Sequence, residues 1–502
     1  MNQLSISAGR CQFCHRTAES VPRLIAGDSA FICSDCVSSC NELLGPEKHE
    51  ENSPTRGERY LFERLARHFE PLRTQELIAT SRTYPLRQQA DLQLALDQLF
   101  GAREVPENFV GVHQPYRHEV LGFAKLLEQG RNAVEIGPAQ YEDVQIGRGE
   151  TVSCLKNGLW LLQRQQSPFA LLLAQHHEYG RSGDCNIEIL AAPGETGSAI
   201  CSQVFGALEQ RLSKDSCYRG RVLSLEQQDP YSGHAARVYV HELDTVARED
   251  VILPEQTLAA VERNVLVFAE QRPALRKLGM STQKGLLFHG PPGTGKTHCI
   301  RFLAGRLPHH TTLLITAEEV GLLPHYMGLA RLLQPALVVI EDADLIARNR
   351  GERTGACDEA MLNRLLNEMD GLRERADVFF ILTTNRPETL EPALAGRPGR
   401  IDQTIEFPLP TAALRQRLIS LYARDLPLPA LLTEELAQRT DGTSPAFIKE
   451  LLRRIAQHHL EASHEGDVTR DIAEAALHEM LFSGGELNAR LLGGAVPEPV
   501  QL

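Results

Sequence analysis

The 502-residue sequence contains no long hydrophobic segment. No apolar run approaches the roughly 18 residues that a membrane-spanning helix needs. The first ten residues, MNQLSISAGR, also lack the apolar core of a signal peptide. We therefore expect a cytoplasmic protein that does not use a membrane.

Basic residues are in short supply, with 52 Lys and Arg against 65 Asp and Glu, a formal net charge of −13. A broad positive surface for nucleic acid is therefore not expected, which argues against a nucleic-acid partner. Apolar residues make up 42% and charged residues 23%, as in an ordinary globular protein, which excludes a disordered or fibrous chain. The sequence also lacks HExxH, so it has no zinc-protease motif of that type.

Cysteine is scarce overall, with 11 in the chain, too few for a disulfide scaffold. Four of the cysteines form two CxxC pairs near the start, Cys11 with Cys14 and Cys33 with Cys36, and 18 residues separate the two pairs. Four thiolates at this spacing can close a tetrahedral Zn²⁺ site with no open position for water. Metal binding would then supply much of the folding free energy of so small a module. The alternatives are coincidental pairs or a redox centre.

The segment CQFCHRTAESVPRLIAGDSAFICSDCVSSCNELL resembles the zinc-binding domain of the ClpX unfoldase over about residues 9–44. The resemblance includes the Phe between the first two cysteines and the RLIAG segment. It implies a module that dimerises and binds protein substrates or adaptors. A purely structural module is the alternative.

A second motif, GLLFHGPPGTGKTH (285–298), places a glycine-rich turn between an apolar run and a predicted helix. Residues 290–297 match GxxxxGK[ST], in which backbone N–H groups surround phosphates, Lys296 reaches the β/γ oxygens and Thr297 binds Mg²⁺. The sequence therefore predicts a site for ATP and Mg²⁺. Its predicted nucleotide-binding residues are Gly290, Pro291, Pro292, Gly293, Thr294, Gly295, Lys296, Thr297 and His298.

An acidic pair follows a later apolar strand in PALVVIEDAD (335–344). In P-loop ATPases the first acid binds Mg²⁺ and the next polarises the attacking water. We therefore assign Glu341 to the metal and Asp342 to the catalytic base. The usual Asp-Glu order is reversed, so a site that binds ATP without turnover is the alternative.

Asn385 ends another apolar strand, where its amide can orient the attacking water, and GRPGRID (396–402) follows. With LNRLLNEMDGL (362–372), these segments resemble the second region of homology of AAA ATPases proper. The resemblance implies that Asn385 is sensor 1. It also implies that Arg397 and Arg400 are fingers that enter the neighbouring subunit's site and neutralise charge on the transferring phosphoryl group. Ion pairs within one subunit are the alternative for both arginines.

The same resemblance suggests further contacts over about residues 248–482. Val251 and Ile252 would lie against adenine, and Lys449 would be a basic second sensor. Tyr326-Met327-Gly328 resembles the aromatic pore triplet of AAA rings, although the helix that follows is short. The triplet could equally be the buried start of that helix.

Together these features predict a multidomain α/β protein. The predicted parts are a zinc-binding domain (1–45), a linker (46–58), a helical and α+β middle region (59–245), a parallel-sheet P-loop AAA domain (246–408), a helical lid (409–485) and a flexible tail (486–502). We expect an ATP-hydrolysing homo-oligomer, by resemblance a hexamer. It would remodel, unfold or disassemble protein partners recruited by the zinc and middle domains. A slow ATP-dependent switch or scaffold is the main alternative, and a nucleic-acid remodeller is a weaker one.

Overall fold

The computed structural model describes most of the chain. The described residues are 10–17, 20–26, 31–44, 59–101, 108–113, 121–175, 184–227, 235–348, 376–390, 401–462 and 466–480. The chain divides into two units, residues 1–59 and 60–502, which we treat separately. None of the helices in the described part is both long and apolar enough to cross a bilayer.

The first unit is a small cysteine-centred module. Strands β1 (Leu24–Ala26) and β2 (Phe31–Cys33) pair antiparallel, and helix α1 (Ser34–Leu44) follows directly. Its core consists of Cys11, Val21 and Cys33. So small a core cannot by itself offset the conformational entropy of ordering the module.

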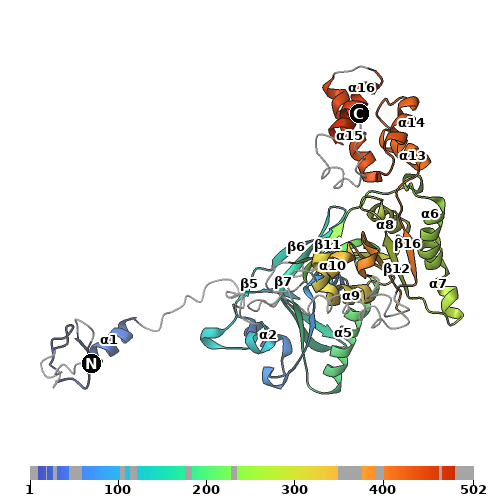
Figure 1. The fold of residues 1–502 in the computed structure, drawn as a ribbon. Coiled ribbons are helices and arrows are strands. Elements are labelled where there is room, and N and C mark those ends of the chain that lie inside the picture. Colours follow the sequence, from blue (N-terminus) through green and yellow to red (C-terminus); the bar gives the residue numbers. More distant parts are fainter. Residues whose placement is uncertain are drawn as a thin grey trace. The chain divides into compact units, whose positions relative to one another are not determined.

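The middle region is built on an antiparallel sheet with strand order β3-β9-β8-β7-β4-β5, to which β6 is added beside β7. Helices α3 and α5 pack on one face and α2 on the other (Figure 1). The strands are β3 (Ile78–Tyr84), β4 (Phe109–Val112), β5 (Ile136–Gly137), β6 (Gln140–Gly147), β7 (Glu150–Arg164), β8 (Ser167–Gln175) and β9 (Cys185–Ala191). The helices are α2 (Leu61–Phe69), α3 (Gln89–Phe100), α4 (Phe123–Leu126) and α5 (Glu195–Lys214), with 3₁₀ turns η3 (Thr74–Glu76), η4 (Leu86–Gln88) and η5 (Gly130–Asn132).

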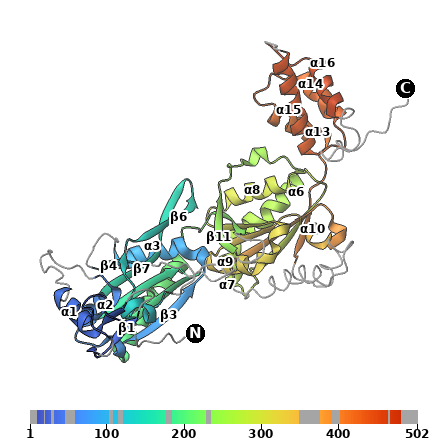
Figure 2. The same ribbon diagram turned by 90° about the vertical axis from the view of Figure 1, so that its left-hand side faces the viewer.

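The part predicted to be the AAA domain (246–408), called the ATPase region below, contains the predicted parallel sheet. Its strands β13, β14, β15, β12 and β16 lie side by side in that order. Strand β14 is completely buried, as expected for a parallel strand covered on both faces. Helices α6 and α8 pack on one face and α9 on the other (Figure 2). The strands are β12 (Lys284–His289), β13 (Thr311–Ile315), β14 (Ala336–Ile340), β15 (Val378–Thr384) and β16 (Gln403–Glu406). The helices are η6 (Arg248–Asp250), α6 (Glu255–Glu262), the π-helical turn η7 (Arg263–Val267), α7 (Phe268–Lys277), α8 (Lys296–Arg306), η8 (Ala317–Leu322), α9 (Leu323–Leu332) and α10 (Ala343–Arg348).

Two strands from before the ATPase region extend this sheet. Strand β10 (Val222–Gln227) pairs parallel with β13, and β11 (Ala235–His241) pairs antiparallel with β10. The sequence analysis placed residues 222–241 in the middle region. Because middle-region residues such as Ile146 and Cys154 share a hydrophobic cluster with residues of β13 and β14, the two regions pack against each other.

Four helices pack around their own core in the part predicted to be a lid: α13 (Ala412–Tyr422), α14 (Ala430–Arg439), α15 (Pro445–Glu461) and α16 (Arg470–His478). Helix α15 starts with Ser444, whose hydroxyl accepts the Phe447 N–H, and with Pro445 at its first position. Both residues favour a helix start.

Candidate functional site

The predicted P-loop is a tight turn between β12 and α8. Gly290, Gly293 and Gly295 all have positive φ, at 143°, 75° and 96°. A Cβ at Gly290 would lie 2.3 Å from the Phe407 carbonyl oxygen, so only glycine fits there. Positive φ at three glycines of one turn is a backbone geometry in which successive N–H groups can surround a phosphate.

Lys296, the first residue of α8, is almost completely buried. Its ammonium group donates to the carbonyl oxygens of Gly290 at 2.8 Å and Pro291 at 2.9 Å. Burial lowers the pKa of Lys296 to about 8, although the nearby Asp342 and Asp344 favour its charged form. A phosphate at the loop would be an additional anionic partner for this ammonium group.

The two predicted magnesium ligands lie next to each other. The Thr297 hydroxyl donates to Glu341 Oε1 at 2.7 Å, although the residues are 44 positions apart. Glu341 in turn lies at the carboxyl end of β14, where its N–H donates to the Ile315 carbonyl at the end of β13. A hydroxyl and a carboxylate oxygen suit Mg²⁺, which is a hard cation.

Asp342 adopts a left-handed backbone conformation, with φ of 49°. Asp and Asn tolerate this region better than Glu, which gives a physical reason for an Asp at this position of the reversed pair. Its N–H donates to the Thr383 hydroxyl at 3.0 Å, and the Asn385 side-chain amide donates to its Oδ1 at 3.1 Å. The structure thus brings the predicted base and the predicted sensor together.

Asp344, which is only 3% exposed, is a further carboxylate that the sequence motifs do not mark. One of its carboxylate oxygens accepts from the Thr384 hydroxyl at 2.8 Å and from the Asn385 N–H at 3.2 Å. These bonds fix the end of β15 and therefore the position of the Asn385 side chain. The only sequence signal was its place two residues after Asp342.

Lys296, Thr297, Asp342 and Asn385 line a cavity of about 480 Å³ together with the entry segment and the lid. Val251, Ile252, His298 and Lys449 all lie on its wall. His298 Nε2 is 3.3 Å from the Asp250 carbonyl, which links α8 to the entry segment. From the lid, the Ala446 N–H donates to the Gly293 carbonyl at 3.2 Å. Arg301, which the sequence analysis did not single out, also lines the cavity.

Some of the predicted residues fall outside the described part of the chain. These are the proposed fingers Arg397 and Arg400 and the LNRLLNEMDGL segment (362–372). Their roles remain those that the resemblance implies.

The structure decides between the two interpretations of Tyr326-Met327-Gly328. Tyr326 and Met327 are fully buried within α9 and belong to the core shared with the middle region. The triplet is therefore part of a buried helix, and the pore-loop interpretation is wrong for this arrangement of the chain. The triplet is buried because strand β10 packs beside α9. The Leu225 N–H of β10 donates to the Tyr326 hydroxyl, and apolar residues of β10 and α9 share one core.

The four predicted metal ligands gather in the first unit. The Sγ atoms of Cys11, Cys14, Cys33 and Cys36 all lie within 4.8 Å of one another. The Cys11–Cys36 separation is 3.8 Å and the Cys14–Cys33 separation is 3.5 Å. Sulfur atoms around tetrahedral Zn²⁺ are about 3.8 Å apart, given Zn–S bonds of about 2.3 Å. The cluster therefore fits zinc.

Electrostatics of the cluster also favour a cation. Burial opposes ionisation of Cys11, but hydrogen bonds from the backbone of Cys14, Cys33 and Phe13 outweigh it and lower the pKa to about 6. The pKa of Cys36 is raised instead, because a hydrogen bond with the Cys33 side chain, burial and the sulfurs of Cys14 and Cys11 all oppose its ionisation. A divalent cation would allow all four sulfurs to ionise.

Comparisons with known proteins agree with these two sites. Residues 286–409 match the model of the ATPase family associated with various cellular activities (AAA), and residues 9–45 match the ClpX C4-type zinc finger. The cell division cycle protein 48 homolog of Archaeoglobus fulgidus is 33% identical over 227 residues, 43% of this chain. The chain spans only 30% of the length of that relative. The middle region, residues 60–245, lies outside both family matches.

Proposed function

Because one chain combines an AAA domain with a ClpX-type zinc finger, we propose that the protein hydrolyses ATP and uses the energy to remodel protein partners. The observation that carries the proposal is the arrangement of Lys296, Thr297, Asp342 and Asn385 around one cavity, with Glu341 hydrogen-bonded to Thr297. This arrangement combines a phosphate-binding loop, two candidate magnesium ligands, a candidate base and an amide that can orient water.

Each residue has a separate task in this proposal. Lys296 and the loop N–H groups bind the phosphates, and Thr297 and Glu341 hold Mg²⁺, which neutralises phosphate charge when bound. Asp342 accepts the proton of the attacking water, which the Asn385 amide helps to position. Arg397 and Arg400 come from the neighbouring copy and stabilise the charge of the transition state.

Two further parts of the proposal concern assembly and recruitment. We infer a homo-oligomer, most simply a hexamer, since fingers supplied in trans make hydrolysis depend on a neighbour. The zinc module and the middle region would recruit the protein partner. Phe13, at the tip of the first cysteine pair, is 68% exposed and is available for an apolar contact.

A second candidate is an ATP-dependent switch with slow turnover. The burial of Tyr326 and Met327 favours it, because these two side chains are not free to grip a substrate. In this case the nucleotide state would control assembly, with no repeated pulling on a partner.

The experiment is steady-state ATP turnover measured against protein concentration. The remodelling proposal expects turnover per chain to rise cooperatively as the oligomer forms, whereas a switch expects little turnover at any concentration. Arg397→Ala should remove turnover but keep ATP binding. Mixed with Lys296→Ala, it should recover a fraction of the activity, because some interfaces would combine an intact P-loop with an intact finger. No recovery would contradict fingers acting in trans.

A further inference from the structure

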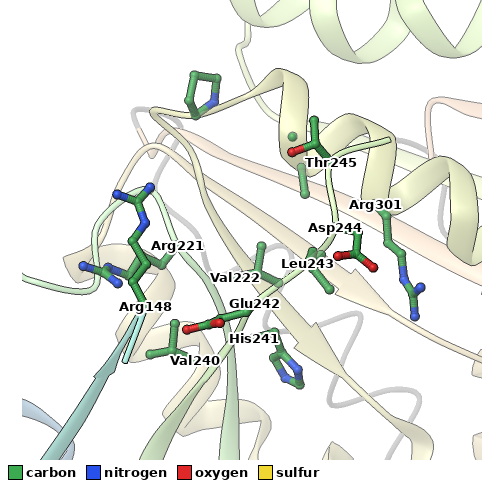
Figure 3. Close-up of a pocket in the computed structure, with 14 residues that line it drawn as sticks. Arg148, Arg221, Val222, Val240, His241, Glu242, Leu243, Asp244, Thr245 and Arg301 are labelled. Carbon is green, nitrogen blue, oxygen red and sulfur yellow. The ribbon is translucent and has the colours of Figure 1, made fainter. Parts of the chain in front are cut away.

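A second cavity, of about 340 Å³, lies where the middle region meets helix α8 (Figure 3). Its walls come from the β6–β7 turn, the start of β10, the end of β11 with the residues that follow, and the C-terminal half of α8. None of the residues assigned above to ATP, magnesium or hydrolysis lines it. We call it the arginine pocket, after Arg148, Arg221 and Arg301 on its walls.

Two of these arginines come together at one end. Arg148 is in the two-residue turn between Gly147 and Glu150, with φ of 57°. Arg221 immediately precedes β10, and Figure 3 shows both side chains on the same side of the pocket. A Cβ at Gly147 would lie 2.7 Å from Arg221 Nη1. The absence of a side chain there therefore lets the Arg221 guanidinium lie directly against the turn.

The arginines of the pocket form few ion pairs with the protein's own acidic side chains. Arg221 has one ion pair, to Glu150 at 3.4 Å, and the Glu150 side chain is 60% exposed. In the described part of the chain, no ion pair involves Arg148 or Arg301. Neighbouring guanidinium groups repel each other, and a carboxylate that accepts hydrogen bonds from both would relieve that repulsion. Two neighbouring arginines with so few ion pairs stand out in a chain whose net charge is −13.

Two carboxylates and several apolar side chains complete the lining. Glu242 and Asp244 lie on the segment after β11, and Figure 3 shows the Glu242 carboxylate on the side of Arg148 and the Asp244 carboxylate beside Arg301. The apolar side chains are Val222, Val240, Leu243, Ala304 and Pro308. The two carboxylates would repel a polyanion such as nucleic acid. The lining suits a ligand that brings one carboxylate for the arginines, an apolar part, and a hydrogen-bond donor for a carboxylate of the pocket.

We propose that the arginine pocket binds an extended segment of a partner protein, with one Glu or Asp side chain of that segment held between Arg148 and Arg221. The pocket volume is at the small end for ligand sites, so it holds a few side chains, not a folded domain. A donor such as a lysine further along the segment would face Glu242 or Asp244.

Arg301 connects this pocket to ATP. Its side chain lines both the arginine pocket and the nucleotide cavity, and it lies on α8, which begins at Lys296. A ligand that contacts Arg301, Ala304 or Gly305 therefore touches the helix that carries the P-loop. Binding of the segment should change the affinity for ATP, and ATP should change the affinity for the segment by the same factor.

The test uses the full chain without nucleotide and an array of immobilised peptides. Each peptide carries one glutamate followed, at varied spacing, by one lysine in a glycine and aliphatic background, and a matched array has glutamine in place of glutamate. We expect the best glutamate peptides to bind at least about tenfold more tightly than their glutamine partners. This comparison uses unaltered protein, and it needs neither ATP nor an oligomer. It therefore succeeds or fails separately from the proposed function.

The variant Arg148→Asn/Arg221→Gln should reduce binding to the glutamine level. Asn is chosen because it tolerates the left-handed conformation at position 148. The matched control, Arg131→Ser/Arg164→Ser, removes two exposed arginines from the middle region and should bind as the natural protein does. The best peptide should also shift the dissociation constant of a fluorescent ATP analogue, and this shift should disappear in the pocket variant.

Several results would overturn the proposal. Equal binding of glutamate and glutamine peptides would exclude recognition of a carboxylate, and full binding by the pocket variant would exclude this location. Competition by inorganic phosphate at about the concentration of the peptide would identify a small-anion site instead. Preference for a single-stranded DNA fragment over the peptides would identify a nucleic-acid site. An unchanged affinity for the ATP analogue would overturn the connection through α8.

Discussion

The Tyr326 hydroxyl accepts a hydrogen bond from the backbone N–H of Leu225 at 2.8 Å, and it donates to the Glu319 carboxylate at 3.2 Å. Leu225 is in β10, so this bond joins helix α9 of the ATPase region to the strand that extends its sheet. Arg219 adds to the connection by donating to the carbonyl oxygens of Leu332, the last residue of the helix, and of Gln334 just after it. Residues 219–225 therefore hold α9 along its length.

This connection predicts the effect of Tyr326→Phe. The change leaves the Leu225 N–H buried without its hydroxyl acceptor, so the free energy of unfolding should fall by about 1–2 kcal/mol. Amide hydrogen exchange at Leu225 should become faster. Tyr326→Ala should cost more, about 3–5 kcal/mol, because it also opens a cavity. Loss of remodelling activity by the Phe variant with unchanged stability and exchange would instead support a gripping role for the tyrosine.

Asp342→Asn should separate ATP binding from hydrolysis. Asn fits the left-handed backbone at this position, so the fold and the affinity for ATP should be unchanged. Turnover should fall by about 10²–10⁴-fold, as expected when a general base is lost. Single-turnover hydrolysis and equilibrium nucleotide binding measure the two effects. Glu388→Gln, an exposed carboxylate nearby, is the control, and normal turnover by the Asn variant would show that another group is the base.

Asp342→Glu tests the reversed acidic pair. It restores the usual Glu at the second position, but a glutamate is poorly tolerated at φ of 49°. We expect no gain in turnover and a small loss of thermal stability. A clear increase in turnover would show that the length of the side chain limits hydrolysis, and not the backbone conformation.

The cysteine cluster predicts about one zinc ion per chain. Cys36→Ser should release the metal and expose residues 1–45 to protease, because the module has little core besides the metal. Cys36→His should retain zinc, since three cysteines and one histidine also form a tetrahedral site. Metal analysis and limited proteolysis of the full chain, with and without chelator, check both outcomes. Full protection of the chelated natural protein would contradict folding by metal binding.

His310 should make stability fall in mild acid. Burial and the adjacent Arg272 lower its pKa to about 4, against the opposing charge of Asp377. The unfolded chain, with an ordinary histidine pKa near 6.5, takes up a proton first. The contribution of neutral His310 to the free energy of unfolding is therefore fully present above about pH 6.5, and it is lost as the pH falls toward 4. The free energy of unfolding, measured between pH 7 and 4, should decline less steeply for His310→Gln than for the natural protein. Parallel curves for the two proteins would contradict this assignment.

Much of the fold could be predicted because its signals are local. The short apolar runs at 159–163, 169–174 and 187–192 by themselves predict strands, and they coincide with β7, β8 and β9; the residues 198–212 predict a helix, and they lie in α5. Between residues 60 and 100 apolar residues recur at helical spacing, which predicts helices alone, whereas the structure also has strand β3 there. All but one of its residues are exposed, so IATSRTY shows no alternation that would mark a half-buried strand.

The amino-acid sequence alone determined the P-loop, the acidic pair and the four cysteines, because each depends on residue types at short, fixed spacings. Only the tertiary structure decided the state of Tyr326, whose partner Leu225 is 101 residues away along the chain. The same holds for Asp344, which holds the end of β15, and for Arg301, which lines two cavities. Burial and hydrogen-bond partners depend on which distant strands become neighbours, and no local spacing encodes that choice.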